Sequence, residues 1–303
     1  MIELWIPITI AGAFFQNARS AMQKHLAGSL TTLGATYVRF LYALPFAILY
    51  VAGLHFWGDM SLPTPNGLFI VYTLLGSFTQ ITFTFFLIWL FSFRNFAVGT
   101  TYTKTEVIQI AILGFLILGD TLTLVSGLAI VIAVIGVLVL SAGQTKVTAA
   151  NLLVSLTEKP TLIGLASGAF LGASVVFFRG AGLALDYDGN FAMRAAYALA
   201  CALIVQTVGM GLFLAVRERH SLIAVLVHWR WSLATGIVGV LTSMCWFTAF
   251  VLQNAAYVRA LGQVELVFTF AASVFFFGER TNRVEIFGIM LVVVGIVILI
   301  LGR

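Results

Sequence analysis

The segment LTLVSGLAIVIAVIGVLVLSAG, which ends at Gly143, contains 22 residues and no charged side chain. A helix rises 1.5 Å per residue, so about 20 apolar residues cross the hydrocarbon core of a bilayer, which is about 30 Å thick. A strand of a transmembrane barrel would instead alternate apolar and polar residues. In lipid, backbone groups need hydrogen bonds within the segment, which a helix provides. Runs of this kind therefore predict membrane-spanning helices.

The composition agrees with this prediction. Of the 303 residues, 61% are hydrophobic and 9% are charged, whereas a soluble domain carries about 25% charged residues. The chain has too little charge to cover a water-facing surface, and we predict an all-α integral membrane protein. Basic loops beside the membrane account for the net charge of +5, so no nucleic-acid partner is required.

Polar breaks divide the apolar sequence into ten expected spans. They cover residues 5–25, 33–55, 66–91, 95–117, 121–141, 161–184, 190–215, 230–252, 255–277 and 283–302. Pro45 is expected to kink the second span, and Pro160 suits the first turn of the sixth. The longest polar connection follows the fifth span. We therefore divide the chain into a first five-helix repeat (1–143), a cytoplasmic linker (144–160) and a second five-helix repeat (161–303).

The two halves of the chain are related in sequence. Adding 159 to the residue number takes Glu106 to Glu265, and a shift of 155 takes Arg39 to Arg194. Because five spans per repeat is an odd number, the second repeat must enter the membrane from the opposite side. This arrangement is the inverted repeat from which many secondary transporters are built.

The distribution of lysine and arginine predicts the orientation in the membrane. Basic residues lie at the breaks on one side: Lys24, Arg94, Lys146, Lys159, Arg217, Arg219, Arg230, Arg280 and Arg283. Acidic residues lie at the breaks on the other side: Asp59, Asp120, Asp186 and Asp188. We expect the basic side to be cytoplasmic and both termini to be non-cytoplasmic, in the inner (plasma) membrane of a bacterium.

These features together resemble the drug/metabolite transporter superfamily, in particular its EamA-type branch with two five-helix repeats. The resemblance is carried by Gly-Asp at 119–120, by Gly-Glu at 278–279, by the arginine that opens the second helix of each repeat, and by glycine-rich closing helices. It covers nearly the whole chain. It implies a ten-helix transporter of small metabolites, since members of the superfamily export or import amino acids, nucleosides, vitamins and amines.

Such families commonly show a Glu-Pro pair 14 residues before the acid of the Gly-Glu motif. Here 120 minus 106 and 279 minus 265 both equal 14, so Glu106 and Glu265 fall on that glutamate. Val107 and Leu266 replace the proline. The sequence therefore gives no proline that would break either helix at this depth.

Glu106 and Glu265 are the main candidates for function, because each lies near the middle of an apolar span. A charged side chain at the centre of a helix costs about 2.5–3.5 kcal/mol even on lenient insertion scales. The carboxyl must therefore face a watery cavity, pair with a cation or carry a proton. A carboxyl that exchanges its proton can couple transport to a proton gradient. The alternative is a structural carboxyl that bonds a neighbouring helix.

Three polar residues near these glutamates have open roles. Lys104 stands where the second repeat has Gln263, and it is too far around the helix to pair with Glu106. It either contacts an anionic group on the substrate or is the counter-ion of Glu265. Arg259 shares a helix face with Gln263. It either binds a substrate carboxylate or extends to the membrane interface, and its place one turn inside the helix favours the interface.

Polar and aromatic residues elsewhere could complete a substrate site. Gln16 begins a polar stripe on the first helix, with Ser20 and Gln23, that is expected either to line a cavity or to hydrogen-bond other helices. Arg39 and Arg194 are expected to anchor helix ends at the interface. Four aromatic residues either stack against a substrate or simply pack: Trp89, Tyr102, Trp246 and Tyr257.

Small residues recur every seven positions along the closing helix of each repeat. They are Ala129, Gly136 and Gly143 in the first repeat, and Gly288, Gly295 and Gly302 in the second. Small residues on one stripe let two helices approach closely. We expect these two helices to pack either against each other or across a homodimer.

The function predicted from these residues is secondary active transport of a small organic metabolite by alternating access, with proton-coupled export as one form. The metabolite would be an amino acid, amine, vitamin or nucleoside-like compound. The alternative is an uncoupled facilitator or channel for a small solute. We expect no enzyme activity, cofactor or metal, because the four histidines lie at loops or span ends and form no metal-ligand spacing. The expected partners are the substrate, membrane lipid and protons.

Overall fold

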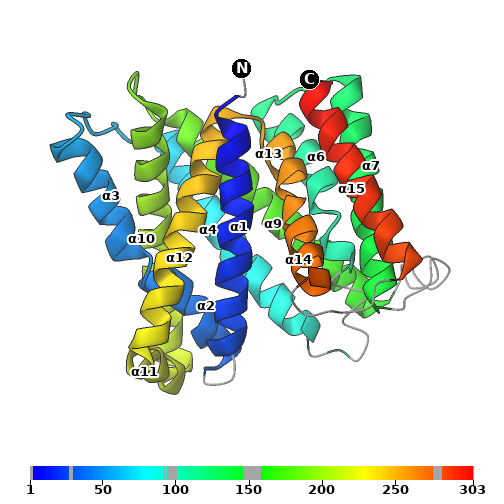
Figure 1. Ribbon diagram of the computed structural model, residues 1–303. Helices are drawn as coiled ribbons and strands as arrows, with labels where there is room; N and C mark the ends of the chain where they lie inside the picture. The colour runs from blue at the N-terminus through cyan, green and yellow to red at the C-terminus, as the bar shows by residue number, and fades with distance from the viewer. Residues whose placement is uncertain are drawn as a thin grey trace. The chain divides into compact units, whose positions relative to one another are not determined.

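The computed structural model describes residues 3–26, 30–91, 93, 101–145, 158–275 and 282–302. In these ranges the chain is built from helices, with one isolated β-bridge between Thr64 and Asp186 (Figure 1). The helices are α1 (Trp5–Leu26), α2 (Thr32–Leu41), α3 (Leu44–Phe56), α4 (Gly67–Phe91), α6 (Glu106–Leu118), α7 (Leu124–Thr145), α9 (Lys159–Ala184), α10 (Phe191–Arg217), α11 (Arg219–Val227), α12 (Trp229–Leu252), α13 (Ala255–Gly262), α14 (Val264–Phe275) and α15 (Arg283–Leu301).

Eight helical segments within the described ranges are long and apolar enough to cross a membrane. The all-α membrane fold is thus confirmed, whereas the count of ten spans stays a prediction. Two expected spans fall outside the eight. The polar residues Gln16, Asn17 and Arg19 lower the hydropathy of α1, and the span expected at 255–277 is divided into the short helices α13 and α14.

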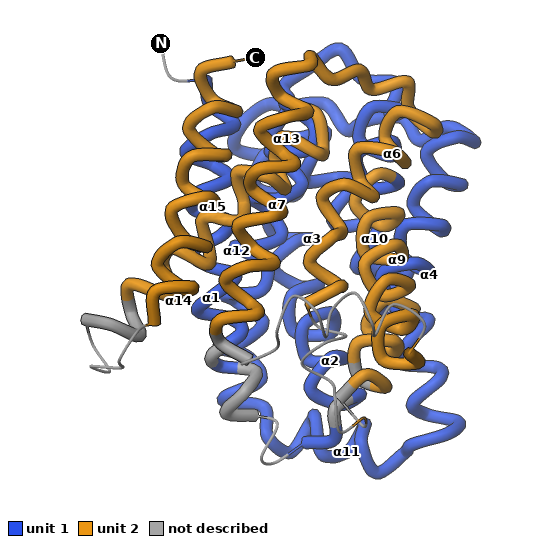
Figure 2. The backbone as a smooth tube through the Cα atoms, turned by 90° about the vertical axis from the view of Figure 1, so that its right-hand side faces the viewer, with its two compact units in different colours: residues 1–81, 177–253 blue, residues 82–176, 254–303 orange. Residues whose placement is uncertain are grey.

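The helices group into two compact units that do not follow the two sequence repeats (Figure 2). Unit 1 contains residues 1–81 and 177–253, and unit 2 contains residues 82–176 and 254–303. Each unit therefore takes helices from both repeats, and the helices α4 and α9 contribute to both units.

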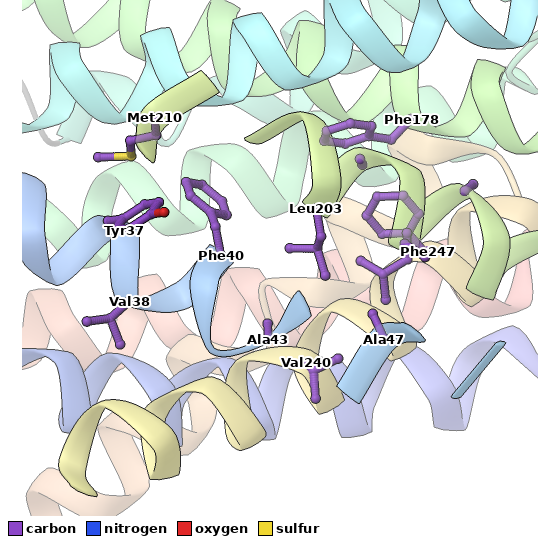
Figure 3. Packing of buried hydrophobic residues seen from close by; sticks show 14 of the residues in the cluster. Tyr37, Val38, Phe40, Ala43, Ala47, Phe178, Leu203, Met210, Val240 and Phe247 are labelled. Atoms are coloured by element: carbon purple, nitrogen blue, oxygen red, sulfur yellow. The ribbon is translucent and has the colours of Figure 1, made fainter. Parts of the chain in front are cut away.

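Unit 1 has a core in which small residues let bulky ones interlock. Alanines along α10 leave room for the rings of Phe40, Phe178 and Phe247, which lie around Leu203 (Figure 3). The rings of Phe178 and Phe247 have centroids 5.0 Å apart. Gln16 of α1 accepts a hydrogen bond from the indole nitrogen of Trp246 on α12 at 3.0 Å.

The second expected span is interrupted beside Pro45, as the sequence predicts. The helix α2 ends at Leu41, and α3 begins at Leu44 with Pro45 in its first turn. Proline is tolerated there because the first helical nitrogens have no partner within the helix. Pro160 has the same place in α9, which begins at Lys159.

The helices α7 and α15 of unit 2 pack side by side along the predicted stripe of small residues (Figure 1). A Cβ atom on Gly136 would lie 2.6 Å from the backbone nitrogen of Val292, and one on Gly295 would lie 2.7 Å from that of Ala133. The backbones are thus in direct contact. Of the two alternatives, the packing of the two closing helices against each other is confirmed.

Gly119 of the Gly-Asp motif ends α6 in a left-handed conformation, with φ 70° and ψ 18°. Its nitrogen donates to the carbonyl oxygen of Phe115 at 3.1 Å, and the nitrogen of Asp120 donates to that of Gly114 at 3.1 Å. These bonds satisfy carbonyl groups that the end of the helix would leave open. The equivalent pair at 278–279 lies outside the described residues.

The conformation of Gly119 gives a testable expectation. A left-handed conformation costs an alanine about 1–2 kcal/mol, whereas asparagine tolerates it better. We expect Gly119→Ala to lower the free energy of unfolding by that amount, and Gly119→Asn to lower it less, in a titration with sodium dodecyl sulfate. Equal losses in the two variants would show that the backbone angle is not the cause.

Candidate functional site

The candidate site is built around two interruptions of the helical backbone, one before each central glutamate. The nitrogen of Lys104 donates to the carbonyl oxygen of Thr101, and the nitrogen of Gln263 donates to that of Ala260, each across three residues instead of four. The second repeat thus copies the turn of the first, since 104 plus 159 is 263. Both interruptions form although neither segment contains a proline.

The interruptions place each ionisable group where a helix end favours its charge. Glu106 and Glu265 lie in the first turns of α6 and α14, where the exposed backbone nitrogens carry partial positive charge. Arg259 lies in the last turn of α13, where the exposed carbonyl groups carry partial negative charge. The helix ends therefore favour the charged forms of these three side chains.

Arg259 and Glu106 form a buried ion pair within unit 2. The Nη2 atom of Arg259 donates to the Oε1 atom of Glu106, and the two residues are 8% and 3% exposed. Arg259 therefore does not extend to the membrane interface, so the favoured interpretation of this residue was wrong. The face of α13 that carries Arg259 turns towards α6, which packs against α13. The carboxylate of Glu106 on α6 holds the guanidinium of Arg259 in the interior.

Lys104 and Glu265 form the second ion pair of unit 2, and they are joined more loosely. The Nζ atom of Lys104 lies 3.5 Å from the Oε1 atom of Glu265. The lysine side chain is 34% exposed and the glutamate side chain 10%. Of the two alternatives for Lys104, the structure shows the counter-ion of Glu265. The four groups form a cluster with no net formal charge, which we call the charge cluster.

Gln263 lies beside the charge cluster and is almost wholly buried. Its Nε2 atom donates to the carbonyl oxygen of Arg259 at 3.4 Å. Its Oε1 atom accepts no hydrogen bond from any described residue. A buried acceptor left without a donor costs about 1–3 kcal/mol. The hydrogen-bonding capacity of this oxygen is therefore not used by any described donor.

The helix α9 holds the first interruption in place through its glycines. Gly164, Gly168 and Gly172 recur every four residues, so they share one face of α9. The carbonyl oxygen of Gly164 accepts a hydrogen bond from the hydroxyl of Thr103 at 3.2 Å. A Cβ atom on Gly168 would lie 3.0 Å from the carbonyl oxygen of Thr103. Backbone-to-backbone packing therefore fixes the segment that carries Lys104.

The aromatic candidates of unit 2 lie on different segments of the chain. Tyr257 is buried in the first turn of α13, two residues before Arg259. Tyr102 is half-buried, and its carbonyl oxygen accepts hydrogen bonds from the nitrogen and the hydroxyl of Thr105. Trp89 is exposed on α4, within an aromatic group that includes Phe86 at 6.2 Å between ring centroids.

The remaining candidates belong to unit 1. Trp246 is buried, holds Gln16 through its indole nitrogen and stacks on Phe250 with ring centroids 5.9 Å apart. For Gln16 the structure shows the alternative role, a hydrogen bond to another helix, and the lining of a cavity stays a prediction. The side chain of Gln23 lies outside the described residues. Among the predicted anchors, Arg194 donates to the carbonyl oxygen of Tyr187.

A model of the EamA-like transporter family matches the chain twice, over residues 3–142 and 158–301. The chain belongs to the EamA-like transporter family. It is therefore a membrane transporter of the drug/metabolite type with two EamA repeats, as the resemblance in sequence implies.

Comparison with solved structures agrees at the level of the fold. A crystal structure of another protein aligns over 97% of this EamA-like chain and 94% of its own, with a TM-score of 0.68 and 14% sequence identity. At that identity the likeness shows a shared fold and nothing about substrate. Comparison with curated proteins gives no significant match.

Three features of this EamA-like transporter were not predicted from its sequence. The first is the pair of helix interruptions, neither of which contains a proline. In the sequence LGQVE, Gly262 is the only local signal for the interruption before Glu265. The glycine stripe of α9 is visible in the sequence GLASGAFLG. The third is Arg179, which donates to the carbonyl oxygens of Phe250 and Gln253, both at 2.5 Å, and so satisfies the end of α12.

Proposed function

We propose that this protein is a secondary active transporter that moves a small organic metabolite by alternating access, with protons as the coupling ion. The observation that carries the proposal is the charge cluster. Four ionisable side chains gather at two helix interruptions inside apolar spans, where charged groups are costly and therefore usually serve function. Interrupted helices of this kind are typical of the binding sites of secondary transporters.

The two ion pairs of the charge cluster are proposed to have different roles. The pair of Arg259 and Glu106 is buried and hydrogen-bonded, so it keeps the two interruptions together. The pair of Lys104 and Glu265 is longer and partly exposed, so it is the pair that opens. A proton on Glu265 would remove its negative charge and release Lys104.

When Lys104 and Glu265 separate, the substrate is proposed to bind the two side chains in place of their ion pair. A released Lys104 can bind an anionic group, and Glu265 can bind a cationic one. The unsatisfied Oε1 atom of Gln263 accepts a hydrogen bond from an N–H or O–H group. These demands fit a small metabolite with polar groups, such as an amino acid, amine, vitamin or nucleoside-like compound.

The test of this proposal is transport by purified protein in proteoliposomes. Candidate metabolites are first screened for saturable counterflow. We expect Glu265→Gln to reduce uptake driven by a pH gradient by about tenfold or more, since the amide cannot exchange a proton. Counterflow of the same metabolite needs no net proton movement and is expected to persist. Glu285→Gln is the matched control, because Glu285 lies at the N-terminus of α15 and bonds Asn282.

Three outcomes would contradict parts of the proposal. Unchanged flux and pH dependence in both Glu265→Gln and Glu106→Gln would remove the coupling role of these carboxyls. Uptake by the wild type that ignores the pH gradient would indicate a facilitator. Conductance at the rate of an ion channel, without saturation, would remove the carrier mechanism itself.

A further inference from the structure

The helix α11 of unit 1 has one face buried against its own unit. It joins the end of α10 to the start of α12 (Figure 1). Ser221 and Val225, four residues apart, are both buried. The hydroxyl groups of Ser221 and Thr31 lie 2.8 Å apart, and the hydroxyl of Tyr42 donates to the carbonyl oxygen of Val225 at 3.1 Å. These contacts hold α11 against α2 and fix which face turns outward.

The outward face of α11 is apolar, which is unusual for a short helix in a loop. Ile223, Leu226 and Val227 lie at spacings of three and four residues, and they are 60%, 56% and 67% exposed. Trp229 and Trp231 follow at the start of α12 and are also exposed. Water is a poor solvent for such a surface, whereas the boundary between headgroups and acyl chains accommodates it.

Three arginines border this apolar face. Arg217 ends α10, Arg219 begins α11 and Arg230 lies in the first turn of α12, and all three are exposed. None of them forms an ion pair with an acidic side chain of the described residues. Arg230 lies over the ring of Trp229, with its guanidinium carbon 5.6 Å from the ring centroid. The positive charge of this border is therefore open to an external anion.

We propose that α11 and its bordering arginines form a binding site for anionic membrane lipid. The apolar face of Ile223, Leu226 and Val227 contacts acyl chains, and the arginines bind the headgroup phosphate. Arginine pairs well with phosphate through its planar fork of donors. A basic and apolar surface of this kind matches both parts of a lipid, whereas free phosphate would contact only its charged rim.

The binding arm of the test compares lipids on the intact purified protein. In native mass spectrometry with equal phosphatidylglycerol and phosphatidylcholine, we expect wild type to retain the anionic lipid preferentially. Each basic residue near an anionic surface contributes about a fivefold increase in affinity. We therefore expect at least about a tenfold loss of anionic-lipid binding in the combined variant R217Q/R219Q/R230Q. Arg283→Gln is the control, because Arg283 is exposed at the start of α15.

The second arm measures the position of α11 in wild-type-like protein and does not depend on the charge variant. A spin label at Ile223→Cys, with Cys201 and Cys245 replaced by alanine, is expected to be more accessible to oxygen than to a water-soluble nickel complex in anionic vesicles. Inorganic phosphate alone is expected to leave the thermal stability unchanged.

The proposal is overturned by any of four results. The first two are equal retention of the two lipids by wild type and unchanged retention of anionic lipid by the charge variant. The third is a spin label that is more accessible to the nickel complex than to oxygen. The fourth is thermal stabilisation by inorganic phosphate equal to that by the lipid. A label shielded from both oxygen and the nickel complex would show that a protein covers this face instead of lipid. The inference does not depend on the transport mechanism, so either can fail alone.

Discussion

Replacing Arg259 with methionine is expected to lower the free energy of unfolding by about 3–5 kcal/mol, because the change leaves a buried carboxylate without its cation. Glu106 is 3% exposed, and the guanidinium of Arg259 donates to it. Because Glu106 is buried, bulk solvent does not reach its carboxylate to replace that bond. The loss is measured by titration of the purified protein with sodium dodecyl sulfate, followed by circular dichroism.

A double-mutant cycle separates the ion pair from other effects of the arginine. Glu106→Gln alone removes the carboxylate that accepts from the buried guanidinium of Arg259, and we expect a loss of similar size. The double variant R259M/E106Q removes both charges, so it should be more stable than the sum of the single losses implies, by at least about 2 kcal/mol. Additive losses would mean that the two side chains do not stabilise each other.

The second large expectation concerns the contact of α7 with α15. A Cβ atom on Gly288 would lie 2.5 Å from the backbone nitrogen of Leu140 and 2.8 Å from its Cα atom. Backbone atoms cannot rotate away as a side chain can, so Gly288→Ala must push the two helices apart. Overpacking of this kind costs about 1–3 kcal/mol. We expect a loss near the upper end in the same unfolding titration.

Gly127 gives the matched control for this substitution, because it lies in α7, the helix that Gly288 of α15 packs against, but away from the contact. A Cβ atom on Gly127 would meet no described atom within 4 Å. Alanine has a higher helix propensity than glycine by up to about 1 kcal/mol. Gly127→Ala is therefore expected to be neutral or slightly stabilising. Similar losses in the two variants would contradict the close approach at Gly288.

Much of the fold could be predicted from hydrophobic patterning alone. Long apolar runs allow only helices in lipid, and the stripe of small residues at Gly136, Gly288 and Gly295 indicated which helices approach closely. The helix α11 was not predicted. Its nine residues are too few to span a membrane, and an apolar periodicity that short is ambiguous in sequence.

The residues of the charge cluster could be predicted, but not their pairing. Ionisable groups inside apolar spans are rare, so Lys104, Glu106, Arg259 and Glu265 stood out in the sequence. Spacing along the chain showed that Lys104 cannot pair with Glu106, and it left two roles open for Lys104. It gave no distance between helices, so the burial of Arg259 against Glu106 was missed.

The sequence by itself determined that this chain spans a membrane, that it consists of two related repeats and that each repeat carries one central carboxyl. These properties follow from the cost of exposing polar groups to lipid, which acts on each segment separately. Only the tertiary structure decided which cation meets which carboxyl, because ion pairs form between helices that are far apart in sequence. It also placed the helix interruptions before Glu106 and Glu265, of which the first packs against α9, and it joined them through the two ion pairs.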